Sequence, residues 1–263
     1  MTFHDITRVV MRALSRRKAE SAGLVLVAAL AAGGLVATGS SSPSSVLAPS
    51  AQFVTAAVSD EEMKSADSFV QWDLANLDHQ RVDSWIGRFT SDLKRSFSTY
   101  MQRMDKYESM ISTKLAQRGM PQELIYLAMI ESGFNPTAKS PAAASGLWQF
   151  IGETGRRYGL KVSRKVDERN NPARATDAAL SYLADLYDRF GSWYLAAAAY
   201  NTGEGRVARI MRQVTGSERG TDADYYKISN RLPRETRDYV PKLIAAARIA
   251  KEPEKYGFED SAS

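Results

Sequence analysis

Apolar residues recur at spacings of three, four and seven positions along much of the chain. Such spacings place side chains on one face of an α-helix, whereas strands alternate with a period of two, a pattern that this chain does not show convincingly. We therefore predict an all-α architecture. The clearest stripe predicts long amphipathic helices over 60–118: Trp85, Phe89, Leu93, Phe97, Met104, Ile111 and Leu115. This stripe can bind a partner, or pack onto the domain that follows, which we favour.

A short helix is predicted to end next to Glu131. Pro121 suits the first helical position, where its missing N–H costs nothing, while Gly133 and then Pro136 end the helix at 132–133. Glu131 then lies in the last turn and shares the apolar face with Leu124, Leu127 and Ala128. An acidic side chain is unusual in such a place.

The rest of the chain predicts further helices. One runs from Asn171-Pro172 to Gly191, and an alanine-rich one from Ser192 to Gly203 should be buried because its small side chains permit close packing. Beyond them we predict an amphipathic helix at Arg206–Val214, a loop at 216–226, and a last helix that Pro233 opens. Pro241 should end or kink this helix, since proline lacks an N–H.

The N-terminal part predicts export of the protein. Basic residues precede an almost uncharged apolar run at 22–38, which is typical of a membrane-targeting segment with a cytoplasmic N-terminus. The run suits either a cleaved signal peptide or an inner-membrane anchor, so we expect a periplasmic or cell-envelope location. A Ser/Ala/Pro-rich linker follows at 39–59, then helices at 60–118, a catalytic domain at 119–256 and a tail at 257–263.

Composition narrows the chemistry. The 263 residues include no cysteine, which excludes thiolate chemistry and a lipidated cysteine. The two histidines are His4 and His79, so Ser-His-Asp catalysis and histidine metal sites are improbable. We therefore expect no cofactor and no metal. The net charge of +5 comes with no nucleic-acid motif and suits an anionic surface, or ordinary solubility. Catalysis by a carboxylate is the mechanism that remains after cysteine, histidine and metal chemistry are set aside.

Glu131 is the candidate for that chemistry. Partial burial and the negative end of the helix dipole both disfavour its ionised form, so its pKa should be raised, as a general acid requires. Alternatively, the apolar face of this helix is assigned wrongly and Glu131 is an ordinary surface glutamate. The small-residue turn at 140–146, followed by Trp148 and Gln149, favours the site, because small residues let backbone approach a ligand and the two side chains offer stacking and hydrogen bonds.

Three runs carry a family resemblance: ELIYLAMIESGFNPTAKSPAAASGLWQFI, LAAAAYNTGEGRV and LPRETRDYVPKL. In this order they resemble the soluble-lytic-transglycosylase type of catalytic domain, glycoside hydrolase family 23, and within it the membrane-bound lytic murein transglycosylase D group. The resemblance implies a lysozyme-like, goose-type helical fold and a peptidoglycan substrate. It implies that Glu131 protonates the bond between N-acetylmuramic acid and N-acetylglucosamine, and then deprotonates the muramyl 6-hydroxyl to close a 1,6-anhydro ring.

The resemblance also implies a set of substrate contacts. It assigns polar contacts with the sugar or its acetamido group to Ser140, Ser145 and Gln149. Tyr200, Asn201 and Tyr239 would line the cleft, with one tyrosine hydroxyl near Glu131. Packing is the alternative for both tyrosines, and core filling is the alternative for Trp148. Unlike the D group, this chain has no lipidated cysteine and no C-terminal wall-binding repeats, so the apolar segment or a cell-wall or secretion-complex partner bound through 60–118 would place it.

Two other functions stay open on the sequence. Ordinary glycosidases use two carboxylates, and a goose-type lysozyme-like hydrolase would use Glu131 with water. Candidates for the second carboxylate, each with a structural explanation, are Glu153, Asp167, Asp177, Glu204, Glu235 and Asp238. We expect Glu235 and Asp238 to pair with Arg234 or Arg237. The other function is a non-catalytic wall-binding scaffold, which would be expected to lack Glu131.

Overall fold

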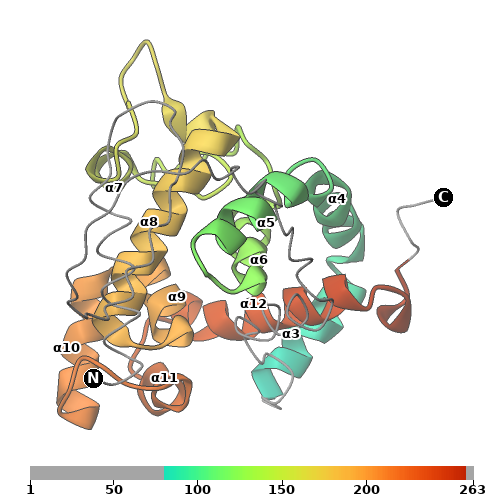
Figure 1. Cartoon of the computed structure of the whole chain (residues 1–263). Helices are drawn as coiled ribbons and strands as arrows, with labels where there is room; N and C mark the ends of the chain where they lie inside the picture. The colour runs from blue at the N-terminus through green and yellow to red at the C-terminus, as the bar shows by residue number, and fades with distance from the viewer. Residues whose placement is uncertain (1–79, 259–263) are drawn as a thin grey trace, which may run out of the picture. The chain divides into compact units, whose positions relative to one another are not determined.

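The computed structural model describes residues 80–258, which fold into packed helices (Figure 1). Within this range there is no strand, only three isolated bridges, so the all-α prediction is confirmed there. The helices are α3 (Gln80–Thr90), α4 (Lys94–Met104), α5 (Glu108–Gln117), α6 (Ile125–Ser132), α7 (Gly152–Arg157), α8 (Pro172–Phe190), α9 (Trp193–Thr202), α10 (Glu204–Thr215), α11 (Asp222–Ser229) and α12 (Arg234–Lys251). Short 3₁₀ turns lie at Gln122–Leu124, Glu168–Asn170 and Glu254–Tyr256.

Several predictions concern residues outside this range. The leader and apolar segment, the linker, the helix start at Asp60 and both histidines lie in 1–79, and most of the tail lies in 259–263. They stay predictions. None of the helices between residues 80 and 258 is long and apolar enough to cross a membrane.

The described part of 60–118 forms three short helices rather than long ones. Turns at 91–93 and 105–107 separate α3, α4 and α5, each of ten or eleven residues. The predicted stripe nevertheless faces the core, with Trp85 and Leu93 partly buried and five members buried: Phe89, Phe97, Met104, Ile111 and Leu115. Because α3 packs against α12 and α5 against α8, these helices are part of the same core as the residues that follow.

Helix α12 holds the core together, since it packs against α3, α6 and α9 (Figure 1). The prediction that Pro241 ends or kinks this helix is wrong about its end, because α12 continues to Lys251. Proline cannot donate to the carbonyl four residues earlier, which belongs to Arg237. The buried Tyr225 hydroxyl donates to that carbonyl at 2.9 Å and so replaces the missing bond.

The loop predicted at 216–226 is partly wrong, because α11 begins at Asp222. Its start is a capping box, in which the Asp224 side chain accepts from the Thr221 backbone N–H at 2.8 Å. Buried Tyr225 and Ile228 anchor this helix. Thr and Asp three residues apart are the local signal that the loop assignment overlooked.

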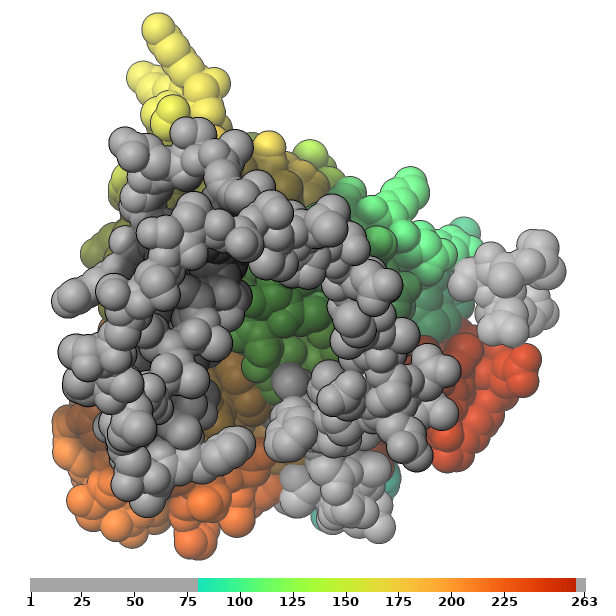
Figure 2. Space-filling view, viewed as in Figure 1, coloured from blue at the N-terminus to red at the C-terminus, as the bar shows by residue number. Residues whose placement is uncertain are grey.

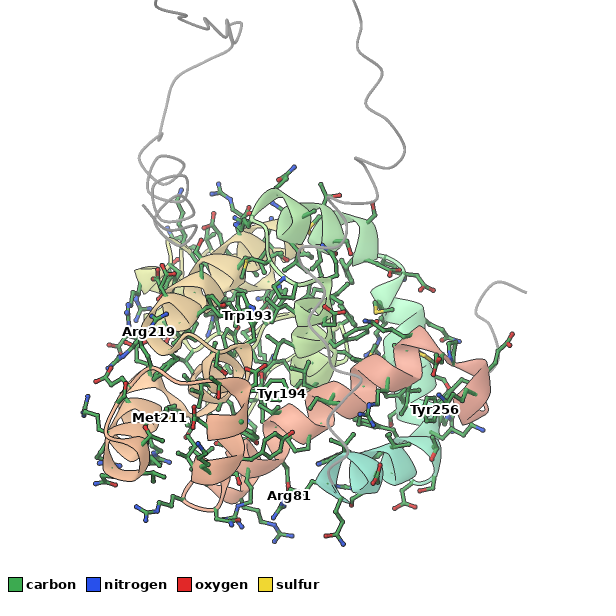
Figure 3. The ribbon with its side chains drawn as sticks, turned by 60° about the horizontal axis from the view of Figure 1, so that its bottom comes forward. Arg81, Trp193, Tyr194, Met211, Arg219 and Tyr256 are labelled. Atoms are coloured by element: carbon green, nitrogen blue, oxygen red, sulfur yellow. The ribbon has the colours of Figure 1, made fainter. Side chains whose placement is uncertain are left out.

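The predicted start and end of α8 and the predicted start of α9 are confirmed. The Asn171 side chain accepts from Arg174 N–H at 3.0 Å at the start of α8, and Ser192 accepts from Leu195 N–H at 3.2 Å at the start of α9. Gly191 ends α8 in the left-handed conformation. The four alanines of α9 are fully buried, as predicted. Figure 3 shows Tyr194, from the same helix, in the middle of the packed helices.

The segment before Glu131 is a 3₁₀ turn that leads into α6. Pro121 precedes this turn, and Glu123 within it is 3% exposed and bound by Lys251 Nζ at 2.5 Å, which ties the turn to the end of α12. α6 ends at Ser132 as predicted, with Gly133 at φ 57°. A Cβ on Gly133 would overlap the Tyr100 ring, so glycine is required there for space as well as for conformation.

Candidate active site

A cleft of ≈ 880 Å³ opens between the end of α6, the segment 140–154, the end of α9 and the start of α12. Trp85 of α3 and Tyr182 of α8 complete its wall. Six of the seven predicted site residues line it: Glu131, Ser140, Gln149, Tyr200, Asn201 and Tyr239. The fold thus brings together three sequence runs that are up to about one hundred residues apart.

Glu131 is partly buried at the C-terminal end of α6. Burial raises the pKa of its carboxyl group to about 7, because the charged form loses its hydration there. A hydrogen bond from Tyr239 and the positive charge of Lys242 act in the opposite direction, and the negative charge of Glu235 adds to the increase. The result is a carboxyl group that exchanges its proton near neutral pH, as a general acid and base must.

Tyr239 is the tyrosine that contacts Glu131. Its hydroxyl donates to Glu131 Oε1 at 2.5 Å, and its ring is buried in α12. The Tyr200 hydroxyl instead donates to the backbone carbonyl of Trp148 at 2.7 Å, which fixes the loop that carries Gln149. Burial raises the pKa of both phenols well above the usual value, so both stay protonated donors.

The segment 138–150 is a tight loop fixed by its own polar groups. Gln149 lies at φ 47°, a rare conformation for a residue with a side chain, and its amide nitrogen donates to Gly146 O at 2.8 Å and Ala138 O at 3.2 Å. Its amide oxygen accepts no hydrogen bond from residues 80–258, and the side chain lines the cleft. Ser140 also lines the cleft, and its hydroxyl oxygen accepts from Ala144 N–H at 3.1 Å.

Ser145 does not line the cleft. It is 2% exposed, and its hydroxyl donates to Asn170 Oδ1 at 2.7 Å. The direct substrate contact predicted for it has no support in this position, and the contact that it makes fixes the loop against the turn at 168–170. Trp148 is also fully buried, and its Nε1–H donates to Thr176 at 3.0 Å, so it fills the core rather than offering a face to a sugar.

Asn201 is held in place by α12. Thr236 donates its hydroxyl to Asn201 Oδ1 at 2.7 Å, and the Asn201 amide nitrogen donates to Glu235 Oε1 at 3.3 Å. With both amide atoms engaged, the side chain has a fixed orientation at the cleft wall. Glu235 is exposed beside it.

Two carboxylates besides Glu131 line the cleft, Glu235 and Asp238. The predicted pairing with Arg234 or Arg237 is wrong for Asp238, because Arg81 of α3 binds it at 2.7 Å, and Figure 3 shows Arg81 where α3 approaches α12. Glu235 forms no ion pair within residues 80–258. Three of the other candidates are paired away from the cleft, Asp167, Asp177 and Glu204, and the fourth, Glu153, is exposed on α7.

The sequence did not predict that Lys242 and Trp85 line the cleft. Lys242 donates from Nζ to Ile130 O at 3.1 Å at the end of α6, and burial lowers its pKa. It follows Tyr239 by three positions, so the two side chains share a face of α12, a spacing that could have indicated it. No local signal marks Trp85, because only the packing of α3 on α12 brings it to the cleft.

Residues 108–222 match the family model of the transglycosylase SLT domain. This part of the chain is therefore similar to the SLT domain over its matched residues. The chain is also 42% identical over 156 residues to membrane-bound lytic murein transglycosylase D of Escherichia coli, a match that covers 59% of this chain and 34% of that protein. It is 34% identical over 125 residues to the soluble lytic murein transglycosylase of Salmonella typhimurium, covering 45% and 19%.

A solved structure is also similar, the 70 kDa soluble lytic transglycosylase of Escherichia coli, at a TM-score of 0.47 and 26% identity over 58% of this chain and 25% of that one. The chain thus spans about a third or less of the length of these relatives. Glu131 and Tyr200 fall inside the SLT match, whereas Tyr239, Lys242 and Trp85 fall outside it. Within residues 80–258, no group of three or more His, Cys, Asp or Glu side chains could hold a metal ion.

Proposed function

We propose that this protein is a lytic transglycosylase that cleaves the β-1,4 bond between N-acetylmuramic acid and N-acetylglucosamine in peptidoglycan. The observation that carries the proposal is Glu131, a carboxyl group with a pKa of about 7 that lines a cleft of saccharide size at the end of α6. The SLT match around it and the names of the relatives support the choice of peptidoglycan.

In the first step, protonated Glu131 gives its proton to the glycosidic oxygen while the bond from that oxygen to C1 breaks. The carbonyl oxygen of the substrate's own acetamido group stabilises the positive charge at C1. Because Tyr239 occupies Oε1, the other carboxyl oxygen is free to carry the proton. The carboxylate that forms is stabilised by the Tyr239 hydrogen bond and by the charge of Lys242.

In the second step, the Glu131 carboxylate accepts the proton of the muramyl 6-hydroxyl as its oxygen bonds to C1. This closes a 1,6-anhydro ring and returns Glu131 to its protonated form, so no water is consumed and no cofactor or metal is needed. We assign polar contacts with the sugar to Ser140, Gln149 and Asn201, which surround the cleft, and cleft walls to the rings of Tyr200 and Tyr239.

We also propose a cell-envelope location outside the cytoplasm. The basic leader and the apolar run at 22–38 support membrane targeting, and the curated relatives are described as membrane-bound or soluble transglycosylases. The substrate lies outside the cytoplasmic membrane, which agrees with this location. A reporter enzyme fused after Ser59 should be active only outside the cytoplasm.

Digestion of purified peptidoglycan by the full chain tests the proposed function. We expect muropeptides with 1,6-anhydro ends, measured by mass spectrometry, and the same products with a chelator present. Glu131→Gln should lower the rate by roughly 10²- to 10⁴-fold, because an amide keeps the shape but cannot exchange the proton. Its circular dichroism should match that of the unmodified chain.

The same digestion separates the alternatives. Reducing ends, which carry one added water, would identify a lysozyme-like hydrolase, and Glu235 would then be the carboxylate to test as its second group. Retention of more than about a tenth of the activity by Glu131→Gln would contradict the assigned acid and base. No cleavage by the unmodified chain would leave the scaffold function.

A further inference from the structure

A second cavity, of ≈ 610 Å³, lies beside α10 and carries three arginines. Arg206, Arg209 and Gln213 follow one another at i, i+3 and i+7, so they share the exposed face of α10, and Arg231 comes from the turn between α11 and α12. The surface of α10 and α11 is the orange region of Figure 2. We call the cavity the arginine pocket.

No carboxylate among residues 80–258 forms an ion pair with the arginines of this pocket. Arg206 makes one hydrogen bond, from NH1 to Thr202 Oγ1 at 3.4 Å, and Arg209 and Arg231 make none with their side chains. By contrast Arg212, also on α10, binds Glu218. Three like charges around one cavity repel one another, and an anion bound between them would relieve this repulsion.

The pocket is built on a fixed backbone. Ile210 and Leu232, which are 6% and 3% exposed, form its apolar floor. The turn that carries Arg231 is pinned from α12, because Arg237 donates to the carbonyl of Asn230 at 3.2 Å and to that of Leu232 at 3.4 Å. Guanidinium groups on a rigid base lose less entropy when they bind a planar carboxylate.

The arginine pocket adjoins the catalytic cleft at two places. Thr202 lines the cleft and binds Arg206 of the pocket, while Pro233 lines the pocket and the next residue, Arg234, lines the cleft. A ligand whose sugar lies in the cleft therefore has a path of a few residues to the arginines. The muramyl sugars of peptidoglycan carry short peptides with free carboxylates, which match this charge.

We propose that the arginine pocket binds a carboxylate of the peptide attached to the glycan strand that the cleft holds. The proposal rests on the proposed function, since it assigns a further part of the same substrate. Arg209 and Arg231 provide the charge, Arg206 joins the pocket to the cleft, and Gln213 offers an amide at the rim. The pocket thereby makes the enzyme prefer glycan that still carries its peptides.

The full chain, purified in detergent, tests this preference. The kcat/KM is measured on peptide-bearing glycan strands and on strands from which an amidase has removed the peptides. In Arg209→Gln/Arg231→Gln, the ratio of the two kcat/KM values should fall by roughly 3- to 10-fold, as expected for two solvated ion pairs. High salt should lower the ratio for the unmodified chain in the same direction.

A matched control removes the same charge elsewhere. Arg95→Gln/Arg164→Gln changes two exposed arginines that line neither cavity, and its ratio should equal that of the unmodified chain. Arg209→Lys/Arg231→Lys should recover part of the preference. An unchanged ratio in Arg209→Gln/Arg231→Gln, or an equal fall in the control, would overturn the proposal.

A binding measurement separates failure of this proposal from failure of the proposed function. A fluorescent muramyl peptide is titrated into the full chain carrying Glu131→Gln, which needs no turnover, and is compared with the same peptide amidated at its carboxyl groups. Stronger binding of the free carboxylate, lost with Arg209→Gln/Arg231→Gln, supports the pocket even if no glycan is cleaved. Inorganic phosphate is titrated in the same way. Equal binding of both peptides, or binding of phosphate without binding of either peptide, would overturn the proposal.

Discussion

At the scale of single residues, the chemistry depends on how burial, the Tyr239 hydrogen bond and the Lys242 charge balance at Glu131. Burial raises the pKa of its carboxyl group, whereas the Tyr239 hydroxyl and the Lys242 ammonium both lower it. The balance lies at about 7, so the group is partly protonated at neutral pH and can act first as an acid and then as a base. Without the Tyr239 hydrogen bond and the Lys242 charge, the pKa of this carboxyl group would lie higher.

Tyr239→Phe should therefore shift the pH profile. The Tyr239 hydrogen bond favours the ionised form of Glu131, so its loss raises the pKa of Glu131 above about 7. Since the first step needs protonated Glu131, the fall of kcat/KM with rising pH should move to higher pH. The maximal rate should also drop by roughly tenfold, because one hydrogen bond no longer orients the carboxyl group.

Tyr200→Phe is the matched control for this prediction. Its hydroxyl binds the Trp148 carbonyl and not Glu131, so the basic side of its pH profile should stay where it is in the unmodified chain. Movement of the Tyr239→Phe profile to lower pH would contradict the assigned hydrogen bond. A profile that moves equally in both variants would mean that general loss of packing, rather than the contact to Glu131, controls the pKa.

At the scale of elements, the site depends on where helices end and on how α12 tolerates its proline. Gly133 ends α6 so that Glu131 lies in its last turn, beside the end of the helix that disfavours negative charge. α12 continues through Pro241 and so carries Tyr239 and Lys242 to the cleft on one helix. Tyr225 of α11 makes this possible, since its hydroxyl binds the carbonyl that Pro241 leaves without a donor.

Tyr225→Phe should lower the free energy of unfolding by about 1–3 kcal/mol, because it leaves the partly buried Arg237 carbonyl without a partner. Pro241→Ala restores an N–H that can bind the same carbonyl. In the double variant, the loss caused by Tyr225→Phe should therefore be clearly smaller, which denaturant unfolding of all four proteins measures as a coupling energy. Additive losses would show that Tyr225 stabilises α12 through its ring alone.

At the scale of the whole described unit, residues before the SLT match belong to the same core as the catalytic residues. α3 precedes residue 108, yet it packs against α12, places Trp85 at the cleft and binds Asp238 through Arg81. The predicted division between 118 and 119 is therefore not a boundary in packing. Two long-range ion pairs, from Arg81 and from Lys251, join α12 to segments far earlier in the chain.

Phe89→Ala tests this unity. Phe89 is 2% exposed between the rings of Trp85 and Phe97, so its truncation should lower the free energy of unfolding by about 3–5 kcal/mol. Fluorescence and circular dichroism should report one shared transition, shifted to lower denaturant. Arg95→Gln, an exposed change on α4, should leave the transition in place. Two separate transitions, with only the first one shifted, would mean that α3 is a separate unit.

The helical fold class, the ends of several helices and the position of Glu131 follow from local sequence. Periodicity, capping side chains and glycines act within a few residues, so the ends of α6, α8 and α9 could be predicted from Gly133, Asn171 and Ser192. The same local pattern placed a carboxyl group on an apolar face at a helix end, which is why its raised pKa was predictable. The capping box of α11 was present too, but it was overlooked.

Contacts across the core, by contrast, set which side chains meet. Tyr239 lies 108 positions from Glu131, and no local pattern distinguishes it from Tyr200, whose hydroxyl points to a backbone carbonyl instead. Ser145 reads as a ligand contact in the sequence but is buried against Asn170. Such outcomes depend on contacts between helices that are distant in the chain, and helical periodicity carries information only about the face of each helix, not about the helix that it meets.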